Sequence, residues 1–214
     1  MKGKNQMRKS LGFTLAEVLI TLAIIGVVAA MTIPSVIINT NQQEFKTGLK
    51  KAVSVLNQAI TMNLALENMG PGDTNTDAAN VNDHHTLMGY LAQRLNVIKS
   101  TDNLIFSAND AFYTSDGMRF EFPSTAATIT GAPAFKRSGC GSGKTEQEAP
   151  CLIVVDVNGD RKPNPIDRTK NQGYSIPDAS NTNTRIFDVF PVMITDTAAV
   201  PYGVVAQRTM FQGD

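Results

Sequence analysis

The sequence contains no tryptophan and is poor in charge, histidine and cysteine. Charged residues make up 18% of the chain, below the roughly 25% of an ordinary soluble domain. The 19 basic and 19 acidic residues balance, which argues against a general attraction to nucleic acid or to an acidic substrate. No Ser-His-Asp, paired-acid or Cys-His arrangement is present, so nothing in the sequence indicates an enzyme.

The charge that exists is unevenly distributed. Residues 1–12 carry four basic side chains and no acid, and taking these four from the 19 basic residues leaves 15 against 19 acidic residues, a net charge of −4. The following 26 residues, 13–38, contain one charge, Glu17. About 20 apolar residues span a bilayer as a helix, and basic residues stay on the cytoplasmic side. The sequence therefore predicts a single membrane span with the bulk of the chain beyond it.

Glu17 distinguishes three interpretations of this N-terminal segment. A cleaved secretory signal peptide explains the basic start, the apolar run and the small residues at 28–30. An ordinary membrane anchor explains the length. Neither has a reason to carry an acid in hydrocarbon, which costs roughly 2.5–3.5 kcal/mol on insertion scales. The acid favours the third interpretation, a segment that pairs its charge with a partner.

The residues from Lys9 to Glu17, KSLGFTLAE, resemble the prepilin cleavage and methylation motif. The resemblance implies that a prepilin peptidase cuts after Gly12 and methylates the new amine of Phe13. It makes Glu17 the fifth residue of the mature chain, and Pro34 matches a proline that disturbs the helix in this family. The resemblance extends over residues 8–40 and implies assembly with other pilin or pseudopilin subunits. The balanced charge predicts no nucleic-acid partner.

A physical argument also supports a role for Glu17 in assembly. Cleavage before Phe13 creates an amine that stays protonatable after methylation, and Glu17 can neutralise it within one subunit or between neighbours. Pairing two charges offsets part of their desolvation. Because a misplaced subunit would leave both charges unpaired, we expect Glu17 to set the register of assembly, as buried polar groups do in coiled coils.

An amphipathic pattern follows the apolar segment. Apolar residues recur every three or four positions at Phe45, Leu49, Val53, Leu56, Ile60 and Leu64, which predicts that the helix continues to about residue 67. Gly26 and Pro34 are expected to bend it, and residues 70–72, Gly-Pro-Gly, to end it. We predict a leader at 1–12, a long helix at 13–69 with 13–38 in the membrane or filament core, and a periplasmic globular domain at 70–214.

The globular part predicts a short helix and several strands. Leu87, Tyr90, Leu91, Leu95 and Ile98 suggest a helix with Asp83 near its cap. Residues 111–114 and 118–122 flank Ser-Asp-Gly, a hairpin signal. Residues 151–157 and 186–195 predict strands, the second with Pro191 at an edge or bulge, and 203–206 a further short strand. The predicted class is α+β, a long N-terminal helix on a small antiparallel sheet, as the resemblance implies.

Cys140 and Cys151 can close a loop by a disulfide, which persists only in an oxidising compartment. Residues 138–145, SGCGSGKT, superficially match a phosphate-binding loop. However, Ser138 stands where that pattern needs glycine, and no hydrophobic strand precedes it. We therefore predict a flexible loop stapled by the two cysteines.

Oxygen-bearing side chains follow the strand at 151–157 with the spacing of an EF-hand loop, at positions 1, 3, 5, 9 and 12: Asp156, Asn158, Asp160, Asn164 and Asp167. Calcium is the candidate ligand, and Asp188 could approach the same site. Two departures oppose it, because Arg161 replaces the turn glycine and position 12 is not Glu. The other interpretation is a structural turn, like the Asp-x-Asn-Gly turn of pilin-like proteins.

The adjacent histidines, His84 and His85, could bind metal, but no third ligand is suitably spaced, so a polar helix start is favoured. The predicted function is a structural subunit of a type IV pilus or type II secretion pseudopilus, first in the inner membrane and then in a filament. The alternative is a periplasmic calcium-binding module exported by an ordinary signal peptide.

Overall fold

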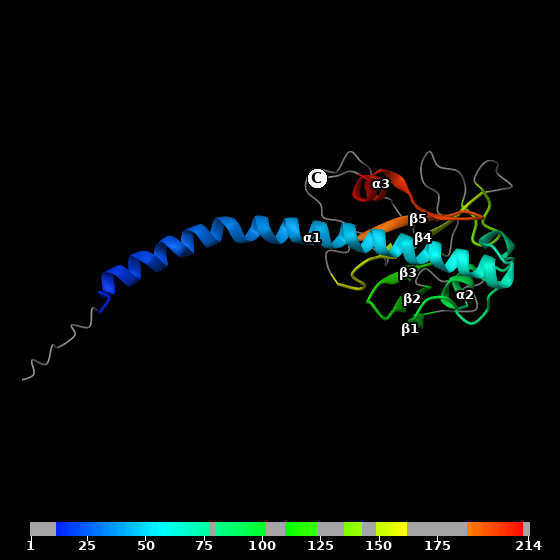
Figure 1. Ribbon diagram of the computed structural model, residues 1–214, viewed down its shortest axis with the longest axis horizontal. Coiled ribbons are helices and arrows are strands. Elements are labelled where there is room, and N and C mark those ends of the chain that lie inside the picture. Colours follow the sequence, from blue (N-terminus) through cyan, green and yellow to red (C-terminus); the bar gives the residue numbers. More distant parts are fainter. Residues whose placement is uncertain are drawn as a thin grey trace, which may run out of the picture. The chain divides into compact units, whose positions relative to one another are not determined.

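A computed structural model describes residues 12–77, 80–101, 110–123, 135–142, 149–161 and 188–211. The chain divides into two compact units, Met1–Asn41 and Gln42–Asp214. The first helix, α1 (Leu15–Glu67), begins in the first unit and ends in the second (Figure 1). The predicted leader at 1–12, apart from Gly12, and the predicted ligands Asn164 and Asp167 lie outside the described residues.

The part of α1 in the second unit buries one face, as its pattern predicts. Residues spaced three or four apart lie in the core with at most 5% of their surface exposed, namely Phe45, Leu49, Val53, Leu56 and Ile60. Leu64 was expected to continue this stripe but is 46% exposed. The helix ends at Glu67, before the predicted Gly-Pro-Gly, because Asn68 takes a left-handed φ of 53° that asparagine tolerates.

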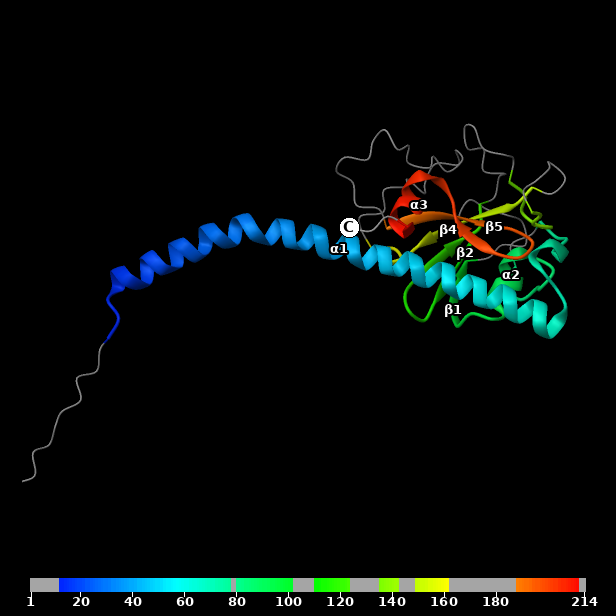
Figure 2. The same cartoon turned by 45° about the horizontal axis from the view of Figure 1, so that its top comes forward.

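The second unit contains a six-stranded sheet in the order β1-β2-β3-β4-β5-β6, with every neighbouring pair antiparallel. In both views α1 crosses one face of this sheet (Figures 1 and 2). The strands are β1 (Val97–Thr101), β2 (Ala111–Thr114), β3 (Arg119–Glu121), β4 (Cys151–Asp156), β5 (Val189–Ile194) and β6 (Ala199–Pro201). The α+β class is therefore confirmed, as are the predicted hairpin and the strand that begins at Cys151.

The main core lies between α1 and the sheet. The register aligns Phe120 with Val155 and Val155 with Phe190, so these side chains share the face that packs on α1, and all three are buried. The helix comes close to the turn after β4, because a Cβ added at Gly48 would lie 2.8 Å from the Cβ of Val157. This close packing joins α1 to the strand that carries Cys151.

A short ion pair ties α1 to the β2–β3 hairpin. The Lys51 Nζ atom lies 2.8 Å from Asp116 Oδ2, and Gly117 in the same turn has a φ of 86°. Burial acts to raise the pKa of Asp116, but hydrogen bonds from Lys51 and Thr114, with the positive charge of Lys51, outweigh burial and lower that pKa. The carboxylate is thus favoured in the folded protein.

The helix predicted from Leu87 to Ile98 is wrong in length and in its cap. Helix α2 spans only Leu87–Ala92, and its cap is Thr86, whose hydroxyl accepts from the N–H of Gly89 at 3.0 Å. Ile98 lies in β1 and is 67% exposed. The β-branched residues of Val97–Thr101 instead pair with β2, which shows that pairing with a neighbouring strand overrides the helical spacing.

Two predictions near the C-terminus are also wrong. Pro191 lies in an interior strand, since β5 pairs with both β4 and β6. The carbonyl of Pro191 accepts from the N–H of Tyr202 at 2.9 Å, so the nitrogen of Pro191 also faces β6. The pairing of β5 with β6 already ends at Val192 and Pro201. The missing N–H of Pro191 therefore removes no hydrogen bond to β4. Residues from Gly203 form a helix, α3 (Gly203–Phe211), rather than a strand.

Candidate functional site

The predicted processing and assembly residues lie at the start of α1. The side chain of Phe13 is 88% exposed, and a Cβ at Gly12 would meet no atom within 4 Å. The Thr14 hydroxyl accepts from the N–H of Glu17 at 3.3 Å, and the Glu17 carboxylate accepts from the N–H and hydroxyl of Thr14 at 2.8 and 2.9 Å. This is a capping box, which satisfies free donors at a helix start.

The capping box adds a residue that sequence reasoning missed. Glu17 was expected to find its partner in an amine, whereas Thr14 already binds its carboxylate within the helix. The signal was present as Thr and Glu three residues apart before an apolar run. Glu17 therefore holds the helix start in place as well as carrying the segment's single charge.

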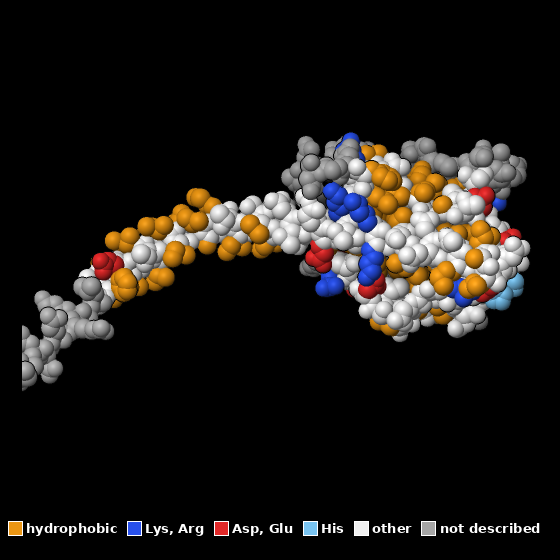
Figure 3. Space-filling view, viewed as in Figure 1, with side chains coloured by type: hydrophobic (Ala, Val, Ile, Leu, Met, Phe, Trp, Pro, Cys, Tyr) orange, Lys and Arg blue, Asp and Glu red, His pale blue; other side chains and the backbone are white. Residues whose placement is uncertain are grey.

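The apolar residues that follow are uncovered. Large hydrophobic side chains from Phe13 to Ile37 are between 44% and 88% exposed, and Figure 3 shows hydrophobic side chains at the surface along the helix of the first unit. Among the described residues one helix, α1, is long and apolar enough to cross a membrane, with a mean hydropathy of 2.3 over a window that has no buried residue. A core helix of a soluble protein would be mostly buried, so that interpretation does not fit.

The few hydroxyl groups of this segment do not need water. The Thr14 hydroxyl donates to the Glu17 carboxylate. The four hydroxyls beyond Glu17, from Thr21, Thr32, Ser35 and Thr40, donate to backbone carbonyls three or four residues earlier, at 2.8–3.0 Å. In hydrocarbon every polar group must find such a partner within the protein. Helix α1 also continues through Pro34, although the proline removes one N–H from the ladder.

The predicted disulfide is present in the second unit. Cys140 and Cys151 are bonded at an S–S distance of 2.06 Å, with their Cα atoms 5.0 Å apart, and both are fully buried. The bond joins the loop at 135–142 to the first residue of β4. The same loop pairs with the chain before β4, because Lys136 donates to Pro150 and Gly141 to Ala149 at 2.9 and 3.0 Å. The segment is therefore held by backbone bonds and by the crosslink.

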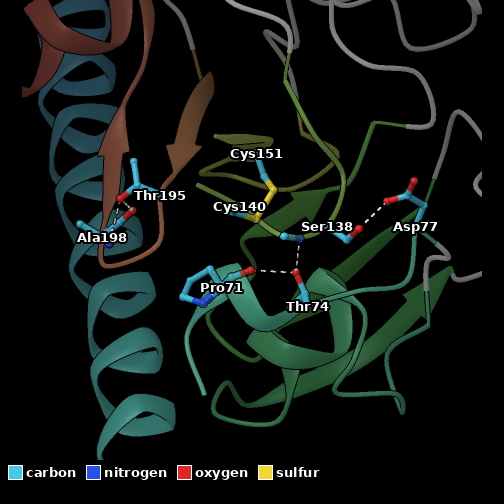
Figure 4. The surroundings of a disulfide bond; sticks show 9 residues. Pro71, Thr74, Asp77, Ser138, Cys140, Cys151, Thr195 and Ala198 are labelled. Atoms are coloured by element: carbon cyan, nitrogen blue, oxygen red, sulfur yellow. Dashed lines mark hydrogen bonds between the residues drawn. A yellow bond between two sulfur atoms is a disulfide. The ribbon is translucent and has the colours of Figure 1, made fainter. Parts of the chain in front are cut away.

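The disulfide loop also binds the segment that follows α1 (Figure 4). The N–H of Cys140 donates to the carbonyl of Pro71 at 3.1 Å, and the N–H of Gly139 donates to the Thr74 hydroxyl at 2.9 Å. Thr74 caps a short 3-10 helix, η1 (Pro71–Asp73), and donates to the carbonyl of Pro71 at 2.8 Å. Sequence reasoning found the two cysteines but not Thr74, since nothing in the sequence links residues 65 positions apart.

The described part of the suspected calcium loop forms a turn. Asp156 ends β4 and is fully buried, and its carboxylate accepts from the N–H of Asn158 at 3.2 Å, the bond expected of an Asx turn. The expected approach of Asp188 is present in its backbone, which accepts from the N–H of Val157 at 2.9 Å. Gly159 has a φ of 75°. This geometry fits the structural turn, and calcium remains a prediction.

Asp160 interacts with neighbouring strands. Its carboxylate accepts from the Tyr113 hydroxyl at 2.9 Å and lies 3.5 Å from Arg119. Arg119 also pairs with Glu121 at 2.6 Å, and both side chains are buried. Within the described residues no group of three or more His, Cys, Asp and Glu could hold a metal ion. His84 and His85 are exposed and lie beside each other, with ring centroids 4.2 Å apart.

The chain carries the prokaryotic N-terminal methylation motif at residues 7–33. This is the prepilin-type motif of type IV pilins and pseudopilins, and the resemblance noted in the sequence is confirmed there. No curated protein and no solved structure matches the chain. The motif at the head of an uncovered apolar helix, followed by an antiparallel sheet, defines a pilin-like arrangement.

Proposed function

We propose that the chain is a structural subunit of a type IV pilus or of a type II secretion pseudopilus, without catalytic activity. The observation that carries the proposal is the methylation motif at the start of a helix whose apolar side chains are uncovered. An uncovered apolar segment of this size needs lipid or other protein chains around it. A membrane provides the first environment and a filament of subunits the second.

In this proposal the precursor sits in the inner membrane with its second unit in the periplasm. The basic leader stays cytoplasmic, and the buried disulfide persists on the oxidising side. A prepilin peptidase then cuts between Gly12 and Phe13 and methylates the new amine. Glu17 pairs with that amine in its own subunit or in a neighbour, and the uncovered helices pack together.

The length and chemistry of the mature N-terminus test this proposal. Mass spectrometry of the mature protein should find methylated Phe13, whereas an N-terminus at Met31 would support the calcium-binding module exported by an ordinary signal peptide. Gly12→Val should block processing by placing a β-branched side chain at the cleavage site. Because a Cβ at Gly12 meets no atom within 4 Å, the fold itself tolerates the change. A mature N-terminus at Phe13 in that variant would contradict peptidase recognition of Gly12.

A further inference from the structure

The two cysteines of the crosslink lie in the core of the second unit. Cys140 and Cys151 are both 0% exposed, and both belong to the cluster of buried side chains between α1 and the sheet. A disulfide forms when a thiolate attacks a sulfur atom of another disulfide, and the second thiol then resolves the mixed disulfide. This exchange needs room for the external reagent at the sulfur atoms. The closed second unit leaves no such room.

The cover of Cys140 comes from residues that precede it in the chain. The N–H of Cys140 donates to the carbonyl of Pro71, and the N–H of Gly139 donates to the Thr74 hydroxyl. The two segments also pack closely, because a Cβ added at Gly139 would lie 3.4 Å from the carbonyl oxygen of Thr74. Since a chain emerges from its N-terminus, this part of the cover is available as soon as Cys140 appears.

The cover of Cys151 comes from residues that follow it in the chain. Cys151 is paired with Ile194 of β5, and Ile194 is paired with Ala199 of β6. The three side chains therefore share the face of the sheet that packs on α1, and all three are buried. Strands β5 and β6 form a hairpin, in whose turn the N–H of Thr195 donates to the carbonyl of Ala198 at 2.8 Å. Figure 4 shows this turn beside α1.

One side chain of α1 holds the β5–β6 hairpin in place. The amide nitrogen of Asn57 donates to the carbonyl of Ala199, and the amide oxygen of Asn57 accepts from the N–H of Ala199, both at 2.9 Å. The same nitrogen donates to the carbonyl of Val53 at 2.9 Å, which fixes the orientation of the amide. This pair of bonds closes the last strand of the sheet on the first helix of the chain.

The order of the sequence leaves a period in which Cys151 is uncovered. Strand β5 begins at Val189, 38 residues after Cys151. At the rate of synthesis, about 5–20 residues per second, these residues take roughly 2–8 s to emerge. A loop of ten residues closes in about 10–100 ns, so two thiols that are 11 positions apart meet many times before β5 is present. The chain has two cysteines in all, so it can form no wrong internal pair.

We propose that the second unit receives its crosslink from an external, disulfide-bearing oxidant before the β5–β6 hairpin docks, and that the hairpin, held by Asn57, then shields both sulfur atoms from further exchange. Two thiols of the chain and one external disulfide give the crosslink and two external thiols, so the oxidant leaves in its reduced form. A subunit that closes without the crosslink stays reduced. The supply of an oxidant rests on the proposed export to the periplasm, whereas the cover and its closure by Asn57 do not.

The full chain, purified in detergent with both thiols reduced, tests the cover. The probe is 5,5′-dithiobis(2-nitrobenzoate), a small disulfide that thiolates attack. Even without its crosslink, a domain at the low end of ordinary stability is unfolded in about one molecule in 30. We therefore expect the thiols to react at least about 30-fold more slowly in the folded chain than in the chain unfolded by urea.

Two matched variants separate the contribution of the hairpin. Asn57→Ala should make the thiols of the folded chain react roughly tenfold faster, because it removes two hydrogen bonds that are partly open to solvent. Gln58→Ala changes the next side chain, which is exposed, and should leave the rate unchanged. As a control for the reagent, Ile98→Cys in a chain with both native cysteines replaced by alanine should react equally fast with and without urea, since Ile98 is 67% exposed.

A pulse of synthesis in cells tests the order of events. Chains made in the presence of dithiothreitol should stay reduced after it is washed out, whereas chains made after the wash should acquire the crosslink. Asn57→Ala chains made during the pulse should recover the crosslink roughly tenfold faster than the wild type. Chains that lack the crosslink when no dithiothreitol is added would contradict the proposed export, and the rates measured in detergent would still decide the cover.

Two results would overturn the proposal. Equal reactivity of the folded and unfolded wild-type chains, with circular dichroism showing that the fold is intact, would refute the cover. Equal rates for Asn57→Ala and Gln58→Ala would refute closure by Asn57. A reduced chain that folds only after an oxidant is added would support the proposed order, because the crosslink then precedes closure in every molecule.

Discussion

Removing the Cys140–Cys151 crosslink should destabilise the second unit by about 3 kcal/mol. The sequence separation is 11 residues. In the chain-entropy model a crosslink that closes a loop of this length lowers the conformational entropy of the unfolded state, which raises its free energy by about 3 kcal/mol. For a domain of 150–250 residues each 1 kcal/mol shifts the melting temperature by roughly 2–4 °C, so we expect a decrease of roughly 6–12 °C.

The assay compares three forms of a chain beginning at Gln42, the first residue of the second unit. These are the oxidised protein, the same protein with both thiols kept reduced, and the variant with Cys140→Ala and Cys151→Ala. The reduced form keeps both sulfur atoms in the core, so it isolates the crosslink. The double variant also leaves a cavity, because both cysteines are fully buried, and should melt lowest.

Thiol labelling of the denatured, unreduced protein provides the independent check. It should detect no free thiol in material exported to the periplasm. Equal melting temperatures for the oxidised and reduced forms, with both shown to be folded by circular dichroism, would refute the entropic argument. Two free thiols in the exported protein would contradict the crosslink itself.

Three other predictions concern the charged residues. Glu17→Ala should still insert but enter filaments poorly, while Thr14→Val, which keeps the charge, should assemble; a sheared-filament assay that recovers Glu17→Ala at the wild-type level would contradict a role in register. Because folding lowers the pKa of Asp116, this carboxylate contributes to the free energy of unfolding above its ordinary pKa of 3.8, and the contribution is lost as pH falls through the folded pKa. The difference in stability between the wild type and Asp116→Asn, a few tenths of a kcal/mol for an exposed pair, should therefore shrink in urea titrations from pH 7 to pH 3. If calcium binds, it should raise the free energy of unfolding of the chain from Gln42 by about 2.7 kcal/mol at a hundredfold excess over Kd, so that this chain melts at a higher temperature in calcium than in chelator. Asp156→Ala should remove the difference, and identical melting would leave only the turn.

The features predictable from the sequence are those set by local patterns. The stripe from Phe45 to Ile60 needs only a helical period, and the hairpin around Gly117 needs only turn chemistry between two apolar runs. Both are confirmed. The cysteine pair was predictable because a loop this short brings its ends together with little cost.

The features that sequence reasoning missed depend on contacts between distant residues. Val97–Thr101 continues an apolar helical spacing, yet it forms β1 because β2 lies beside it. Pro191 reads as an edge residue, and only the end of β6 at Pro201 shows why an interior strand accepts it. Residues 203–206 are apolar and β-branched enough to suggest a strand, but they begin a helix that packs on β5 and β6.

The two units handle polar groups in opposite ways, and this difference supports the proposed change of environment. The described part of the second unit buries an ion pair, Arg119 with Glu121, and has uncovered large apolar side chains at only a few positions. In the part of the first unit beyond Glu17 the hydroxyls bind backbone carbonyls and the large apolar side chains are uncovered. Such a helix can move from lipid into a packed bundle without exchanging any hydrogen bond with water. Glu17 is the exception, so its charge is the one feature of the segment that can distinguish a correct position in the bundle from a shifted one.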